Sequence, residues 1–150
     1  MESPTHITQA PAPGVVLARG VCRCLIGHGV SPLTEMALPD RLRMDVTGLA
    51  RDGMVWGVEV KSSRADFLSD AKWPGYRAWC DLFFFAVPEG FAEALLPVDA
   101  GLIRVDAHGG EVLRLPQAHK LPPARRRAVT LRFARLAAER LTARETRAIG

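Results

Sequence analysis

A chain of 150 residues, 48% of them apolar, is long enough for one domain with a buried core. The three cysteines, Cys22, Cys24 and Cys80, are odd in number and form no CxxC pair. This pattern argues against a disulfide framework and a structural zinc site, and it predicts a cytoplasmic location. The longest unbroken apolar run, residues 82–87, is far shorter than the ~20 residues of a membrane helix. Because the N-terminal segment also lacks the features of a signal peptide, the sequence predicts a soluble protein.

The net charge of +4 is unevenly distributed along the chain. Residues 120–150 carry nine basic and two acidic side chains, whereas residues 1–119 carry eleven basic and fourteen acidic ones. This asymmetry is typical of a polyanion-binding segment attached to a mildly acidic body. The alternative is a solvated arginine face, because 17 of the 20 basic residues are arginine.

Apolar periodicity and the positions of glycine and proline predict the order of elements. Residues 1–13 are rich in proline and are predicted to be a disordered tail, followed by a single domain over 14–150. The predicted elements are a helix at 14–29, strands at 33–38, 42–50 and 54–61, a helix over 63–80 that Pro74-Gly75 kinks or divides, a strand at 82–87, a hairpin at 102–106 and 111–115, and a helix at 124–143. The order α-β-β-β-α-β, followed by a hairpin and a helix, predicts an α/β domain with a mixed sheet flanked by helices.

The loop between the strands at 42–50 and 54–61 determines their register. Arg51-Asp52-Gly53 suits a three-residue hairpin loop, because such a loop requires a left-handed residue last and Gly53 occupies that position. Ala50 then pairs with Met54. A two-residue turn would instead shift the register by one residue and turn the side chains of one strand to the opposite face.

Two carboxylates and an ammonium group converge in the three-residue-loop register. Asp45 then lies directly opposite Glu59, and Lys61 projects from the same face, since alternate strand residues share a face. Carboxylate and carbonyl oxygens suit Mg²⁺ or Mn²⁺, so Asp45, Glu59 and the backbone carbonyl of Val60 form a candidate metal site. The metal would polarise a phosphoryl oxygen and acidify a water, and Lys61 could orient that water or stabilise charge on the phosphate. The alternative is a sheet face whose charges only pair with each other.

Candidate nucleic-acid contacts come from basic and aromatic side chains outside this hairpin centre. Lys72 and Tyr76 are four residues apart on a predicted helix, so both could face the site. Tyr76 could stack on a base, or it could be a half-buried core residue. The candidate phosphate contacts are Arg43, Arg125, Arg126, Arg127, Arg132 and Arg135.

Asp45 followed by Glu59-Val60-Lys61 resembles the pattern of the PD-(D/E)xK nuclease superfamily, which has the restriction-endonuclease-like fold. Met44 stands where the superfamily name implies proline, a position that the chemistry does not use. The wider sequence, from about residue 15 to residue 141, resembles the MmcB-like DNA repair family. The segments that carry this resemblance are Arg43-Met44-Asp45, Glu59-Val60-Lys61-Ser62-Ser63, Asp66-Phe67, Asp70-Ala71-Lys72-Trp73-Pro74, Tyr76, Cys80-Asp81, Phe84-Phe85-Ala86-Val87-Pro88, His119-Lys120-Leu121 and residues 128–134.

The resemblance implies a role in DNA damage tolerance or repair, with DNA as the partner. Repair or replication proteins are further candidate partners, and the chain could form a homodimer. It also makes Glu35, upstream of the hairpin, a candidate metal-facing carboxylate; the alternative is a solvated or arginine-paired glutamate. Two functions remain open: metal-dependent hydrolysis of DNA phosphodiesters, and a catalytically silent DNA-binding or adaptor role. The presence of Asp45, Glu59 and Lys61 together favours hydrolysis, because a pure binder has no chemical need for all three.

Overall fold

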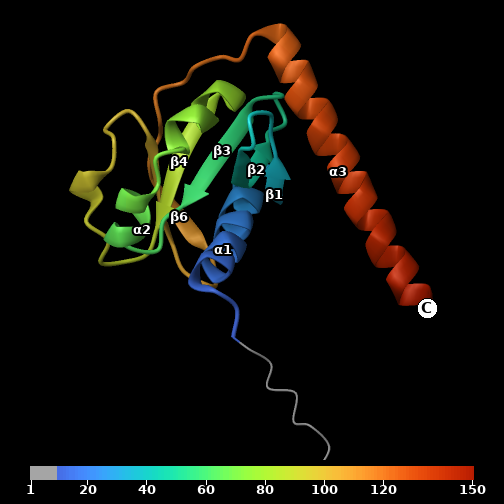
Figure 1. Ribbon diagram of the computed structural model, residues 1–150, viewed down its shortest axis with the longest axis horizontal. Helices are drawn as coiled ribbons and strands as arrows, with labels where there is room; N and C mark the ends of the chain where they lie inside the picture. The colour runs from blue at the N-terminus through green and yellow to red at the C-terminus, as the bar shows by residue number, and fades with distance from the viewer. Residues whose placement is uncertain (1–9) are drawn as a thin grey trace, which may run out of the picture.

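A six-stranded mixed sheet with the strand order β1-β2-β3-β4-β5-β6 forms the centre of the structure. The computed structural model describes residues 10–150 (Figure 1). In chain order the elements are α1 (Pro13–Gly27), β1 (Ser31–Ala37), β2 (Arg43–Leu49), β3 (Val55–Val60), α2 (Arg64–Ser69), the 3₁₀ helix η1 (Trp73–Trp79), β4 (Leu82–Val87), the short 3₁₀ helix η2 (Glu93–Leu95), β5 (Gly101–Val105), β6 (Gly110–Arg114) and α3 (Pro123–Ile149). The predicted mixed α/β sheet flanked by helices is confirmed.

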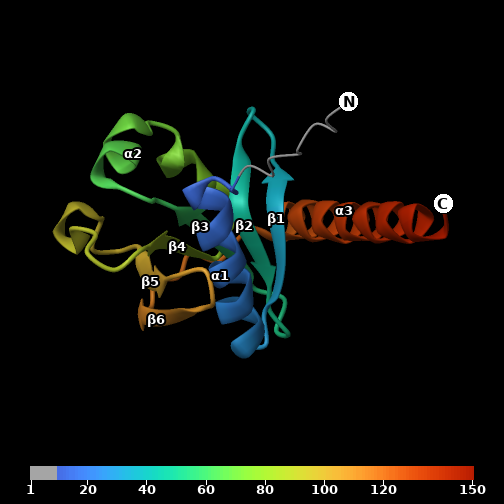
Figure 2. The same ribbon diagram turned by 90° about the horizontal axis from the view of Figure 1, so that it is seen from below.

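The sheet combines an antiparallel half with a parallel half, and both of its faces are covered. β1, β2 and β3 are antiparallel, β4 and β5 run parallel to β3, and β6 returns antiparallel to β5. One face packs against α1 through a cluster that includes Val21, Val58 and Phe84. The other face packs against η1 and α3 through a second cluster, which includes Phe85 and Phe133. Figure 2 shows α1 lying across the sheet, while α3 projects past the edge strand β1.

The register of the β2–β3 hairpin is the one that the three-residue loop predicts. Val46 pairs with Val58, and the Ala50 N–H donates to the Met54 carbonyl at 3.0 Å. Gly53 ends the loop with a φ of +86°, a conformation that a residue with a side chain rarely adopts. The predicted register is therefore confirmed.

The segment predicted as one divided helix over 63–80 breaks earlier than predicted. Ser63 caps α2 by accepting a hydrogen bond from the Asp66 N–H, as its sequence pattern indicates. The helix ends at Ser69, because Asp70 adopts an extended conformation and its carboxylate accepts a hydrogen bond from the Lys72 N–H. The chain then resumes as a 3₁₀ helix with proline in its first turn, where a missing N–H is tolerated.

The two ends of the described chain also differ from the predicted boundaries. Helix α1 begins at Pro13 rather than at residue 14, and residues 1–9 of the predicted tail lie outside the described residues. Helix α3 continues to Ile149, six residues beyond its predicted end, although every residue from 141 to 150 is exposed. Good helix formers such as alanine and arginine sustain the helix there without tertiary contacts. Between residues 10 and 150, no helix is long and apolar enough to cross a bilayer.

A buried ion pair attaches the start of α3 to the sheet. The Asp81 side chain is fully buried and accepts hydrogen bonds from the Val55 and Leu121 N–H groups at 2.7 and 2.8 Å and from Arg126 Nη1 at 2.8 Å. Burial raises the pKa of Asp81, but the Arg126 guanidinium and the two N–H groups outweigh it and hold the pKa below its usual value. Asp81 therefore joins β3, the segment before α3, and α3 itself.

Replacing Asp81 with asparagine should destabilise the fold by about 2 kcal/mol, because the half-buried Arg126 guanidinium would lose its counter-ion. For a chain of this length that corresponds to a fall in Tm of roughly 4–8 °C, measured by thermal denaturation at pH 7. Since the pKa of Asp81 is lowered in the folded state, its contribution is present above pH ~4 and is lost as the pH falls below that. A difference in Tm that persisted undiminished at about pH 2.5 would contradict this assignment.

Candidate active site in the β2–β3 hairpin

The side chains of Asp45 and Glu59 connect β2 to β3 beyond the point where the backbone pairing of these strands ends. The paired positions of β2 and β3 end at Val46 and Val58. Beyond them, the Asp45 N–H donates to Glu59 Oε1 at 3.0 Å, and the Val60 N–H donates to Asp45 Oδ2 at 2.8 Å. Each carboxylate thus replaces a backbone acceptor of the ladder, which fixes both side chains in one orientation.

The backbone around Asp45 is irregular. Met44 and Val46 would share a face in a regular strand, yet Met44 packs in the cluster with Phe85 whereas Val46 packs in the cluster with α1. On the neighbouring strand, Glu35 has a φ of +51°, which is uncommon for a residue with a side chain. The strands therefore change their side-chain orientation at the position of the candidate site. Such distortions are frequent next to functional sites.

Lys61 lies beside the carboxylates but is paired with a third acid. Its side chain is almost completely buried, and its Nζ lies 2.6 Å from Asp70 Oδ2. Burial raises the pKa of Asp70, but the hydrogen bond from Lys61 and those from the backbone outweigh it, so the pKa is lowered. The sequence prediction missed Asp70 as the partner of Lys61. Asp70 meets Lys61 because α2 ends at Ser69 and the chain is extended at Asp70.

Glu59 and Asp45 resist ionisation together. Burial and the nearby Asp45 charge raise the pKa of Glu59 to about 9, against the opposing effects of Lys61 and the Asp45 N–H. Burial also raises the pKa of Asp45, although the Val60 N–H and Lys61 act in the other direction. Two carboxylates this close favour one shared proton, or a cation in its place.

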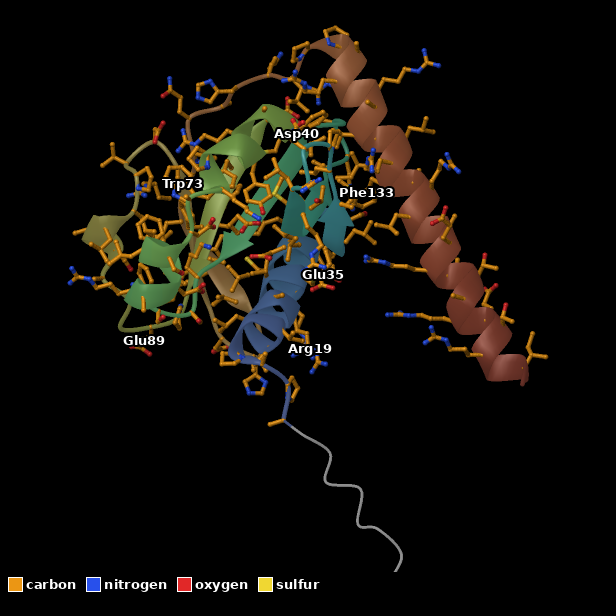
Figure 3. The ribbon with its side chains drawn as sticks, in the orientation of Figure 1. Arg19, Glu35, Asp40, Trp73, Glu89 and Phe133 are labelled. Carbon is orange, nitrogen blue, oxygen red and sulfur yellow. The ribbon has the colours of Figure 1, made fainter. Side chains whose placement is uncertain are left out.

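A cleft of about 500 Å³ opens onto these groups. It is bounded by the start of α1, β1, the hairpin centre and α2. Asp66 at its margin accepts hydrogen bonds from the N–H and Oγ of Ser62. Figure 3 shows Glu35 on β1 above Arg19 on α1, on the side of the body that faces α3. The lining residues are Ala12, Gly14, Val15, Ala18, Arg19, Thr34, Glu35, Asp45, Glu59, Val60, Lys61 and Asp66.

The donor atoms at the cleft are those that a hard divalent cation accepts. Asp45 and Glu59 are the close carboxylates, the Val60 carbonyl adjoins them in the chain, and Glu35 lines the same cleft. Among residues 10–150, no three histidine, cysteine, aspartate or glutamate side chains form a ready metal cluster. A cation held here by two carboxylates would therefore keep several waters, which is how Mg²⁺ is usually bound. Among the described residues that line the cleft there is no histidine or cysteine, the ligands that zinc favours.

Lys72 and Tyr76 do not share a face as predicted. Lys72 is exposed, whereas Tyr76 is only 7% exposed and packs in the core beside Met36 and Met44. Burial, with the Glu59 charge next, raises the pKa of Tyr76 to about 12. Stacking of Tyr76 on a base is therefore not supported, because the ring would have to leave the core.

The predicted arginines are divided between structural and exposed positions. Arg126 is held by Asp81 as described above, and the Arg125 guanidinium lies 5.0 Å from the centre of the Trp79 ring. Arg132 donates to the Ala37 carbonyl at 3.2 Å. Arg43, Arg127 and Arg135 are exposed, and Arg43 is adjacent to the site residue Asp45. The carboxylate cleft is not lined by any of the five α3 arginines that the sequence predicted as phosphate contacts.

Comparison with known proteins places this geometry in a family. A solved structure described as SPO1766 protein of unknown function from Silicibacter pomeroyi is 46% identical, with a TM-score of 0.88 over 91% of this chain and 94% of that one. No curated protein matches the chain. The family model described as DNA repair protein MmcB-like matches residues 2–148, nearly the whole sequence. The chain therefore belongs to the MmcB-like family of DNA repair proteins.

Proposed function

We propose that this protein hydrolyses DNA phosphodiesters in a repair pathway, using Mg²⁺ or Mn²⁺. The observation that carries the proposal is the position of two carboxylates at an open cleft with Lys61 beside them: Glu59 accepts from the Asp45 N–H, and Asp45 accepts from the Val60 N–H. The pKa of the buried Glu59 carboxyl is raised by its burial and by the Asp45 charge, so this group destabilises the fold at neutral pH. A chemical role explains why such an arrangement is present.

Each site residue has a distinct part in the proposed reaction. Asp45, Glu59 and the Val60 carbonyl would hold the cation, which when bound polarises a phosphoryl oxygen and promotes deprotonation of a water. The backbone N–H groups of Asp45 and Val60 keep the two carboxylates oriented toward the cleft. Lys61 provides positive charge where negative charge increases on the phosphate, and Asp70 holds its ammonium group in position.

Family and motif support the proposal at two levels. Membership of the MmcB-like DNA repair family supports DNA as the partner. The finer assignment, to the PD-(D/E)xK nuclease superfamily and the restriction-endonuclease-like fold, rests on the order Asp45, Glu59 and Lys61 within a hairpin. A cytoplasmic location is proposed with it, because Cys22, Cys24 and Cys80 are all unpaired thiols. Repair or replication proteins and a second copy of the chain are further candidate partners.

One observation favours a second candidate, a catalytically silent DNA-binding or adaptor protein. The Lys61 ammonium is already neutralised by Asp70, and this ion pair would have to be shared with a phosphate during catalysis. The adaptor role requires DNA binding without a cation at Asp45. The two candidates therefore differ in whether Asp45 and Glu59 bind a divalent ion.

Cation binding should be visible as thermal stabilisation. Mn²⁺ at about one hundred times its Kd should stabilise the protein by about 2.7 kcal/mol, or roughly 5–10 °C in Tm. Asp45→Asn should abolish this shift, because the neutral amide is a poor ligand. Asp52→Asn, which changes an exposed loop carboxylate of the same hairpin, is the matched control and should retain it. A shift that survives in Asp45→Asn would place the cation elsewhere.

A further inference from the structure

Helix α3 changes its chemistry along a single face. In its first half this face carries Val129 and Phe133, which are buried against the body. At ~100° per residue, the same face continues through Arg140, Arg144 and Arg147. These three arginines, the inner arginine row, begin where α3 leaves the body, since residues 141–150 are all exposed. Apolar anchoring therefore gives way to positive charge on one continuous stripe.

The inner arginine row has no acidic counterpart on the helix. The two acids of α3, Glu139 and Glu145, lie roughly 110° or more around the helix from the centre of the row. In the described part of the chain, neither Arg144 nor Arg147 forms an ion pair or a hydrogen bond through its side chain. Cations three and four residues apart on a helix repel each other. The helix dipole accounts for Arg147 in the last turn but not for Arg140, which lies more than two turns from the end.

The row starts at the rim of the carboxylate cleft. Arg140 donates to the carbonyls of Thr34 and Glu35 at 2.5 and 3.2 Å. Both residues line the cleft that contains Asp45. Arg19, on α1, adds a further cation at the rim. Figure 3 shows nitrogen-tipped side chains on the side of α3 that faces the body.

We infer that the inner arginine row binds the phosphate backbone of DNA and directs the strand toward the Asp45–Glu59 cleft. The row spans about 10 Å along the helix, the axial length of about three phosphates on one strand. Of the arginines that the sequence singled out, Arg127 and Arg135 lie on the side of α3 opposite the inner arginine row. This inference rests on the proposed function for naming DNA as the partner, but it does not require cleavage.

The test compares two double charge reversals on the same helix. Arg144→Glu with Arg147→Glu changes the inner arginine row, and Arg127→Glu with Arg135→Glu is the matched control on the outward face. All four residues are exposed, so both variants should melt within about 2 °C of the wild type. Binding is measured by fluorescence anisotropy with a labelled 20-base-pair duplex and the matching single strand, in EDTA so that no metal-dependent cleavage occurs.

The inner double variant should bind at least tenfold more weakly at about 100 mM salt, and its log–log salt slope should fall by about 2. The outward variant should lose no more than about threefold. Equal losses in both variants, or an unchanged inner variant, would overturn the inference. So would a change in oligomeric state with DNA affinity unaltered, since a second copy of the chain would then occupy the row.

The same variants separate this inference from the proposed hydrolysis. If the wild type cleaves no DNA while the inner variant alone loses binding, the proposed hydrolysis is rejected and DNA binding by the inner arginine row is supported. If the wild type cleaves DNA and the inner variant binds normally, the proposed hydrolysis is supported and DNA binding by the inner arginine row is rejected.

Discussion

Asp45→Asn should lower the rate of Mn²⁺-dependent DNA cleavage by about 10³-fold or more, and Lys61→Ala by about 10²–10³-fold. Asp45 is expected to affect the reaction through the cation and Lys61 through charge on the phosphate. The measurement is single-turnover cleavage of labelled DNAs that include a duplex, a flap, a junction and a single strand. The panel also identifies which form of DNA is cut.

Asp52→Asn controls for the loss of a carboxylate from the same hairpin. Asp52 lies in the exposed loop, where its Oδ1 accepts a hydrogen bond from the Met54 N–H, and an asparagine oxygen can replace it. This variant should cleave as the wild type does. Failure of the wild type to cut any substrate, with salt-sensitive binding retained in every variant, would favour the adaptor role.

Glu59→Gln should stabilise the metal-free protein while removing its activity. The wild type must either keep a proton on Glu59 or bury a second negative charge beside Asp45. Glutamine keeps an oxygen for the Asp45 N–H and cannot ionise. At pH 8, linkage from a pKa of about 9 sets an upper limit of roughly 5 kcal/mol. Because Glu59 and Asp45 titrate as a pair, only part of this limit belongs to Glu59. We expect about 3 kcal/mol, or roughly 6–12 °C in Tm, by thermal denaturation in EDTA.

The sign of the pH dependence follows from the raised pKa of Glu59. The stability associated with its proton is fully present below pH ~4.5 and is lost as the pH rises toward about 9. The wild type should therefore lose stability over this window, whereas Glu59→Gln should vary less. The two proteins should become similar near pH 4.5, where both carry a neutral group at position 59.

Glu35→Gln is the matched control for the stability experiment. Glu35 lines the same cleft but is exposed, so its neutralisation should leave the metal-free Tm within about 1–2 °C of the wild type. Equal stabilisation by Glu35→Gln would mean that general repulsion in the cleft, and not burial of Glu59, produces the effect. Destabilisation by Glu59→Gln would show that the carboxylate is needed as an ionised acceptor.

Local patterns were sufficient for the centre of the candidate site. The loop Arg51-Asp52-Gly53 determines the hairpin register through the left-handed glycine, and this register brings Asp45 next to Glu59 just beyond the last paired positions, Val46 and Val58. The apolar run over 82–87 predicts a buried strand because no polar residue interrupts it. In both cases the decisive interactions lie within a few residues of each other.

The partners of Lys61 and Asp81 and the burial of Tyr76 depend on how the helices and strands are placed in the tertiary structure. Lys61 meets Asp70 only because α2 ends at Ser69, and Asp81 meets Arg126 across 45 residues of sequence. The same long-range packing removes Tyr76 from the surface.

The sequence by itself therefore determined that an arginine-rich helix follows the sheet, and that two carboxylates and a lysine gather on one hairpin. Which arginines face the cleft depends on how α3 is docked, with Val129 and Phe133 against the body and Arg140 on the β1 carbonyls. Helical periodicity specifies which residues share a face but not which face is turned inward. Only the tertiary contacts of α3 decide that orientation.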